Sequence, residues 1–221
     1  MESSTNAKLI EEELKEHKFI TDLPNYEEDE IKPFKGDIKG APYNKMISNI
    51  DIEKEDFRWY MQDSLADLIN QAGTFPLSID HTRYENNYTE SIIMNLDFSD
   101  AKGSHWICLT FDNDPPAEIR KLKTNRICYS YDSFGRDILS IAPVAADAIL
   151  KANYAIFNST YEQQHMESYM CGYMALSIAK KIREGLIDNV SLTPKIFMEV
   201  VYKVFGDTPD RRDITRALKF A

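Results

Sequence analysis

A cysteine followed by a glycine, at the start of a run with helical periodicity, is the feature of this sequence that points most directly to chemistry. Cys171 and Gly172 follow a polar stretch and begin an amphipathic segment. A thiol at a helix N-terminus lies near free backbone N–H groups and the positive end of the helix dipole, and both favour the nucleophilic thiolate. The pattern predicts a reactive cysteine at position 171. An ordinary buried core cysteine is the alternative.

Two further motifs offer what a thiolate nucleophile needs, a base and a group that orients the base. His105 lies between a Lys-Gly-Ser turn and an apolar, strand-like run, so a rigid strand would hold it in place to act as a general base. Asp132 ends a later strand-like run and could fix the tautomer of the imidazole. A strand-edge histidine and a turn-forming aspartate are the alternatives without a catalytic role.

A pair of glutamines precedes the cysteine. The side-chain amide of Gln164, or that of Gln163, could donate a hydrogen bond to an oxyanion, with the backbone N–H of Cys171 as the second donor. A surface glutamine pair is the alternative. Each of these signals is weak by itself, and it is the order His, Asp, Cys at the ends of successive elements that favours catalysis.

The elements that must position these residues follow from periodicity and turn residues. Helices are predicted at 5–18, 51–72, 137–151 with an interruption near Pro143, 171–183 with Gly185 at its end, 193–205, and from Thr208 onward; strands are predicted at 91–98, 106–111, 126–132 and 154–157. Residues 22–45 are rich in proline and glycine and are expected to be extended, and 112–125 to be an exposed loop. Helices, then a meander of strands, then helices indicate an α+β fold.

Length and composition limit the classes of protein. The chain of 221 residues is 43% hydrophobic, which fits one domain with extensions, and neither a signal peptide nor a membrane-spanning segment is predicted. The three cysteines, Cys108, Cys128 and Cys171, fit no zinc motif and suit a reducing compartment, so we expect no metal and no secretion.

The net charge is −10, and residues 1–40 hold 11 acidic and 6 basic residues. This charge disfavours nucleic acid and favours a neutral or basic protein as partner.

The motifs Ser104-His105-Trp106, Tyr131-Asp132-Ser133-Phe134-Gly135 and Gln164 with Cys171-Gly172 resemble those of the adenovirus-protease and ubiquitin-like-protein-protease superfamily of cysteine peptidases. The seven-residue step from Gln164 to Cys171 is similar to the adenoviral branch. The resemblance covers about residues 90–183. His105 and Asp132 are 27 residues apart, more than is usual in the family, which fits an insertion in the 112–125 loop.

The resemblance implies a central, mostly antiparallel sheet packed against a helix that carries the nucleophilic cysteine, with flanking helices, in a papain-like, adenain-type topology. It implies Cys171 as nucleophile, His105 as base and then acid, and Asp132 as the group that orients His105. Gln164 would be the oxyanion donor, and Trp106 would shield the His–carboxylate pair beside the substrate. No cofactor is expected, and neither the activating peptide nor the DNA activation of adenoviral protease is carried over.

Residues 1–45 are expected to form an acidic N-terminal extension and 46–221 a cysteine peptidase domain. The expected function is cleavage of viral capsid or other structural precursors at glycine-containing sites during virion maturation, for a virophage, a polinton-like element or another large DNA virus. The protein would act as a monomer in the virion and the infected cell, away from membranes. A protease that removes ubiquitin-like proteins, an acetyltransferase and an inactive binding scaffold are the alternatives.

Overall fold

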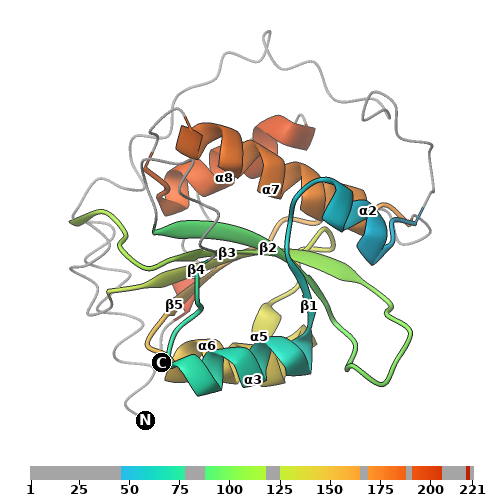
Figure 1. Cartoon of the computed structure of the whole chain (residues 1–221). Helices are drawn as coiled ribbons and strands as arrows, with labels where there is room; N and C mark the ends of the chain where they lie inside the picture. Colours follow the sequence, from blue (N-terminus) through green and yellow to red (C-terminus); the bar gives the residue numbers. More distant parts are fainter. Residues whose placement is uncertain are drawn as a thin grey trace, which may run out of the picture.

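The computed structural model describes residues 46–77, 88–117, 125–164, 169–187, 191–205 and 218–219, and these form a sheet between two layers of helices (Figure 1). The strands lie in chain order: β1 (Trp59–Met61), β2 (Thr89–Asn95), β3 (Trp106–Asp112), β4 (Ile127–Tyr131), β5 (Ala155–Ser159) and β6 (Leu218–Lys219). The pairs β2–β3, β3–β4 and β5–β6 are antiparallel, whereas β1–β2 and β4–β5 are parallel. The predicted α+β class with a mostly antiparallel sheet is confirmed.

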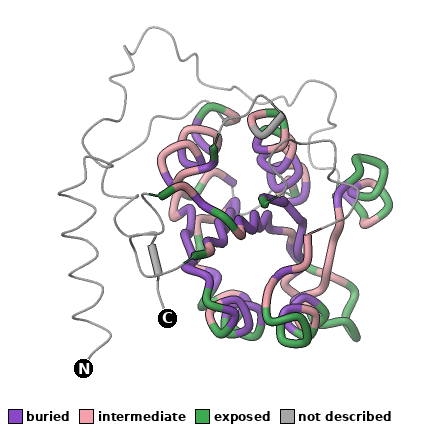
Figure 2. The backbone as a smooth tube through the Cα atoms, turned by 60° about the vertical axis from the view of Figure 1, so that its left-hand side comes forward, coloured by how far each residue is buried: buried purple, intermediate pink, exposed green. Residues whose placement is uncertain are grey.

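Helices cover both faces of this sheet. One layer contains α2 (Asn49–Lys54), α7 (Cys171–Ile187) and α8 (Pro194–Phe205); the other contains α3 (Gln62–Ala72), α5 (Ile138–Ile141) and α6 (Pro143–Lys151) (Figure 1). Two apolar cores result, one on each face. Every residue of β2, β4 and β5 is therefore buried, and the strands show none of the alternation of a half-exposed sheet (Figure 2).

The four predicted strands are confirmed, with ends displaced by at most three residues, and so is the interruption of the helix at Pro143, which begins α6. The prediction of one helix over 51–72 is wrong. A capping box between Ser48 and Asp51 starts a short helix α2, Asp56 has a positive φ of 61°, and β1 then pairs with β2. Strand pairing thus overrides the helical spacing of the apolar residues.

The helix that begins at Cys171 is longer than predicted, because it continues through Gly185 to Ile187. The predicted helix at 5–18 and the extended segment at 22–45 lie outside the described residues, as do residues 118–124 of the predicted loop and residues 208–217 of the helix predicted from Thr208 onward. Leu218 and Lys219, which follow, form strand β6 and not a helix. Within the described residues, no helix is both long enough and apolar enough to span a membrane.

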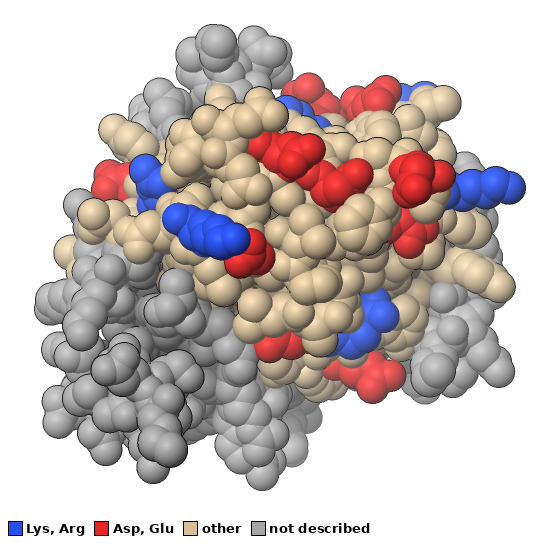
Figure 3. Space-filling view, turned by 90° about the horizontal axis from the view of Figure 1, so that it is seen from below, with Lys and Arg blue, Asp and Glu red and all other residues tan. Residues whose placement is uncertain are grey.

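The topology brings three chain segments to one end of the sheet. The residue before β3 and the residue after β4 are neighbours there, because these strands are antiparallel with Cys108 opposite Tyr131. Helix α7 packs across β2 and β3. On the surface of the molecule formed by α3 and α6, the Lys and Arg side chains are separated and lie among acidic and uncharged ones (Figure 3). Within α6, for example, Lys151 is paired with Asp147. The described part of that face therefore has no continuous basic patch.

Candidate active site

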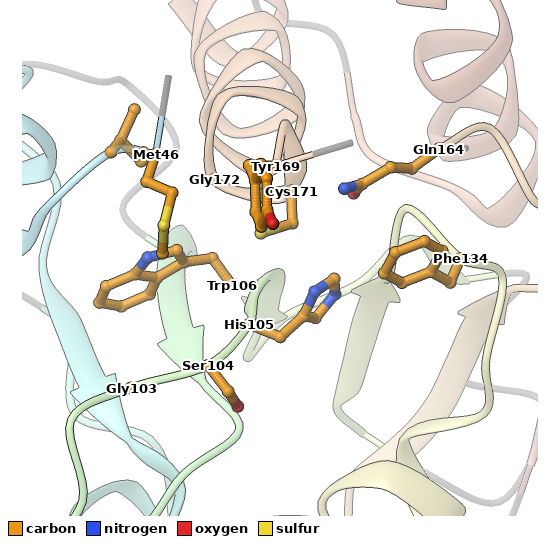
Figure 4. Close-up of a pocket in the computed structure, with 11 residues that line it drawn as sticks. Met46, Gly103, Ser104, His105, Trp106, Phe134, Gln164, Tyr169, Cys171 and Gly172 are labelled. Atoms are coloured by element: carbon orange, nitrogen blue, oxygen red, sulfur yellow. The ribbon is translucent and has the colours of Figure 1, made fainter. Parts of the chain in front are cut away.

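A cavity of about 190 Å³ opens where the three segments meet. Cys171, the first residue of α7, His105, the residue before β3, and Gln164, from the segment after β5, all point toward this space (Figure 4). Met46, Ile47 and Trp106 line its apolar side. The cavity thus has a thiol, an imidazole and an amide at one end and an apolar wall at the other.

His105 and Asp132 form a buried pair directly beneath the cavity. His105 Nε2 lies 2.6 Å from Asp132 Oδ1, and the two residues are 8% and 0% exposed. Because Asp132 occupies Nε2, Nδ1 is the ring nitrogen that remains for the hydrogen bond between His105 and Cys171. A carboxylate at one imidazole nitrogen and a thiol at the other is the arrangement that general-base activation of a cysteine requires.

The electrostatics of the pair favour a thiolate and an imidazolium. Burial raises the pKa of the Cys171 thiol, but the hydrogen bond with His105 and backbone hydrogen bonds at Trp106 and Gly172 outweigh burial and lower it overall. Burial lowers the pKa of His105, but hydrogen bonds with Asp132 and Cys171 outweigh burial and raise it overall. Cys171 therefore keeps its nucleophilic form at a lower pH than an ordinary thiol.

The other two cysteines have the opposite environment. Cys108 on β3 and Cys128 on β4 are 0% exposed. Burial raises the pKa of Cys108 to about 12 and that of Cys128 well above its ordinary value. Of the three thiols, only Cys171 combines access to solvent with a lowered pKa.

The carboxylate of Asp132 is held by a second partner, Arg136, which the sequence did not reveal. Arg136 Nε donates to Asp132 Oδ2 at 2.7 Å, its backbone N–H to the same oxygen at 3.1 Å, and Nη2 to Oδ1 at 3.3 Å. Burial raises the pKa of Asp132, but hydrogen bonds with His105 and Arg136 lower it overall, so the carboxylate stays ionised. In the sequence, the only sign of this contact is that Arg136 follows Asp132 by four residues, with Gly135 between them.

The two glutamines have different roles in the structure. Gln164 is 3% exposed and lines the cavity, and its Oε1 accepts a hydrogen bond from Ser133 Oγ at 2.5 Å. Since the oxygen of the amide accepts from Ser133, the nitrogen is the atom that can donate to an oxyanion. Gln163 instead accepts from Tyr131 Oη at 2.8 Å and donates to the Val201 carbonyl at 3.2 Å. The geometry thus distinguishes Gln164 from Gln163, and Ser133 is a further residue that the sequence did not identify.

Two glycines allow the segments to approach closely. A Cβ on Gly172 would lie 2.2 Å from Ile47 Cγ1 and 3.1 Å from Trp106 Cδ1. A Cβ on Gly135, whose φ is +64°, would lie 2.7 Å from the Tyr161 backbone. Gly172 thus lets α7 begin against the cavity wall, and Gly135 lets the turn after β4 pack against the segment that carries Gln164.

Trp106 lines the cavity, and its ring lies edge-to-face with that of Trp59, with 6.0 Å between centroids. The ring stacked on His105 is that of Phe134, with 5.1 Å between centroids and 27° between planes. A shielding role for Trp106 stays a prediction, and Phe134 is the aromatic residue in contact with the imidazole. Within the part of the chain that the structure describes, no group of three or more His, Cys, Asp or Glu side chains is arranged to hold a metal ion.

No protein-family model and no curated protein matches the sequence. Among solved structures, the chain is similar to a crystal structure of the selenomethionine form of the ASFV pS273R protease, at a TM-score of 0.32 and 13% sequence identity. The alignment covers 76% of this chain and 70% of that chain. A likeness at this level defines no family, so the chemistry of the site follows from its own geometry.

Proposed function

We propose that the chain is a cysteine peptidase in which Cys171 is the nucleophile, His105 the general base and acid, and Asp132 the group that orients His105. The observation that carries the proposal is the buried contact of 2.6 Å between His105 Nε2 and Asp132 Oδ1, with Cys171 on the other side of the imidazole at the N-terminus of α7. Gln164 and the Cys171 backbone N–H are the proposed oxyanion donors.

The reaction follows from these positions. The Cys171 thiolate attacks the carbonyl carbon of the scissile peptide bond, and the oxyanion of the tetrahedral intermediate accepts from the two donors. The His105 imidazolium then gives its proton to the leaving amine as the C–N bond breaks, which leaves a thioester on Cys171. Water, deprotonated by His105, attacks the thioester; the C–S bond then breaks, and release of the carboxylic acid product regenerates the Cys171 thiolate and the His105 imidazolium.

The proposed substrates are viral capsid or other structural precursors, cleaved at glycine-containing sites during virion maturation by a monomeric enzyme in the virion or infected cell. The resemblance of the His-Trp, Asp-Ser-Phe-Gly and Gln-to-Cys-Gly motifs to the adenoviral branch supports this choice. The apolar wall of Met46, Ile47 and Trp106 also favours an uncharged substrate segment over a charged one.

A mass-spectrometric digest of a peptide library, with and without Cys171→Ala, tests the proposal. Cleavage beside glycine that disappears in the variant is the expected result, and unchanged cleavage by Cys171→Ala would rule out the proposed nucleophile. Labelling of Cys171 by vinylsulfone probes with ubiquitin-like tails, without cleavage of the library, would instead identify the deconjugating protease. Processing of a co-expressed capsid precursor then decides whether the role is viral maturation.

A further inference from the structure

Arg136 and Phe134 both contact the His105–Asp132 pair, Arg136 at the carboxylate and Phe134 at the imidazole. Both carboxylate oxygens of Asp132 are bound by Arg136, and Oδ1 is shared with His105. The Arg136 guanidinium also lies over the Phe134 ring, at 5.0 Å from its centroid, and the other contact of that ring is the stack on His105. Arg136 therefore reaches the imidazole by two routes, one through a carboxylate and one through an aromatic ring.

The turn that carries this arrangement is fixed by its own contacts. The Gly135 N–H donates to the Asp132 carbonyl at 2.8 Å, and the backbone N–H groups of Gln163 and Gln164 both donate to the Ser133 carbonyl at 2.9 Å. Phe134 forms an isolated β-bridge with Glu162. The backbone of the turn is thus held by the neighbouring segment, so Arg136 is not needed to form the turn itself.

The Asp132 carboxylate requires partners because it is completely buried. An ionised carboxylate away from water must be paired and hydrogen-bonded on both oxygens, or it rotates or becomes protonated. If the Arg136 side chain were absent, Oδ2 would keep the backbone N–H of residue 136 as its partner, and the side-chain contacts that hold the carboxylate against His105 would be lost.

We propose that Arg136 is a positioning residue of this site, which acts through Asp132 and Phe134 to hold His105 in the orientation that presents Nδ1 to Cys171. Arg136 is not among the residues that line the cavity. Its effect is on the orientation of the base, and a planar guanidinium with two contacting nitrogens suits that task better than a single ammonium.

Since this role rests on the proposed nucleophile Cys171, the test measures alkylation of the thiol and not hydrolysis, so the two proposals can fail separately. Iodoacetamide reacts with the thiolate, and the hydrogen bond with His105 is the contact that most lowers the pKa of Cys171, so the rate at pH 6, below the ordinary thiol pKa, reports on this contact. Cys108 and Cys128 are fully buried and do not compete in the folded protein. Intact-mass spectrometry of the full chain gives the rate constant.

Arg136→Ala is expected to lower the alkylation rate at pH 6 by about tenfold or more. Because the Arg136 side chain is 41% exposed, guanidinium ions can reach the vacated position, and 50 mM guanidinium chloride should restore most of the rate, whereas 50 mM sodium chloride should not. Arg136→Lys is the second variant, and it keeps a cation beside the buried carboxylate in case Arg136→Ala does not fold. Its Cys171 should be alkylated at a rate between those of the wild type and Arg136→Ala.

Arg183→Ala is the matched control, since Arg183 also lies over an aromatic ring, that of Phe57, and donates to backbone carbonyls, but far along α7 from Cys171. It should alkylate at the wild-type rate. The proposal is overturned if folded Arg136→Ala alkylates within twofold of the wild-type rate, or faster, or if guanidinium gives no more recovery than sodium chloride.

Discussion

Two arginine–carboxylate pairs in this molecule have nearly the same construction and different surroundings. In one, Arg58 contacts Glu90 through Nε at 2.6 Å and Nη2 at 2.7 Å and lies 4.8 Å from the centroid of Phe75. In the other, Arg136 contacts Asp132 and lies over Phe134. Both carboxylates are almost completely buried, and both arginines are about one-third to two-fifths exposed.

The difference lies in where each ion pair is connected to the rest of the structure. Arg58 also donates to the Pro76 carbonyl, so the Arg58–Glu90 pair joins the residue before β1, strand β2 and the segment after α3. Asp132 instead has His105 on Oδ1, and His105 opens onto the cavity with Cys171. The same ion pair therefore stabilises tertiary structure at one site and orients an acid–base group at the other. A buried ion pair alone does not indicate a catalytic role; the contact of Asp132 with His105 at the cavity does.

Neutralising the two carboxylates separately should give the largest contrast. Asp132→Asn should lower kcat for peptide hydrolysis by about 10²- to 10⁴-fold, because the amide no longer fixes the tautomer of His105 or supports its charge. Glu90→Gln should leave kcat unchanged and lower the free energy of unfolding by about 1–3 kcal/mol. Steady-state kinetics and thermal unfolding of both variants measure this. A loss of kcat in Glu90→Gln as large as in Asp132→Asn would remove the distinction between the pairs.

The second contrast is between the adjacent glutamines next to the Asp132 turn. Gln164→Ala should lower kcat by about 10²- to 10³-fold with little change in KM, because an oxyanion donor acts on the transition state. Gln163→Ala removes the hydrogen bonds with Tyr131 and Val201 and should cost stability of about 1 kcal/mol without a large effect on kcat. Equal kcat values for the two variants would show that Gln164 is not the donor.

The smallest effect is expected at Ser133, which orients the Gln164 amide. Ser133→Ala should lower kcat by about tenfold, since it removes one hydrogen bond that holds the donor nitrogen toward the cavity. Ser140→Ala is the control, because the Ser140 hydroxyl also makes a local hydrogen bond, to the Asp137 carbonyl, at an exposed position. If Ser133→Ala retained the kcat of Ser140→Ala, the hydroxyl would have no part in orienting Gln164.

Part of the fold and the candidate residues could be predicted from the sequence because they depend on local signals. Boundaries between elements located Cys171 at the start of a helix, His105 before a strand and Asp132 at the end of one. The apolar runs of β2 to β5 identified the strands. Pro143, the first residue of α6, predicted the interruption between α5 and α6.

What could not be predicted depends on contacts between distant segments. Strand β1 forms because β2 offers an edge for pairing. The apolar residues at 51–72 have helical spacing, so the local sequence predicted a helix there and gave no sign of the strand. Ser133 is next to Gln164 because β4 and β5 are parallel neighbours whose ends lie side by side. Arg136 follows Asp132 by four residues, a spacing that brings side chains together in a helix. Here the segment is a turn, so the contact between the two side chains could be found only in the structure.

The pH dependence of Cys171 alkylation is the most direct test that this site activates a thiolate. The lowered pKa of Cys171 and the raised pKa of His105 both favour the thiolate–imidazolium pair, and the thiolate is lost as the pH falls through the Cys171 value. The wild-type rate constant with iodoacetamide should therefore stay high well below the ordinary thiol pKa of about 8.5, and His105→Ala should move the midpoint upward toward it. A wild-type profile with the ordinary midpoint, unchanged in His105→Ala, would contradict the proposed active site.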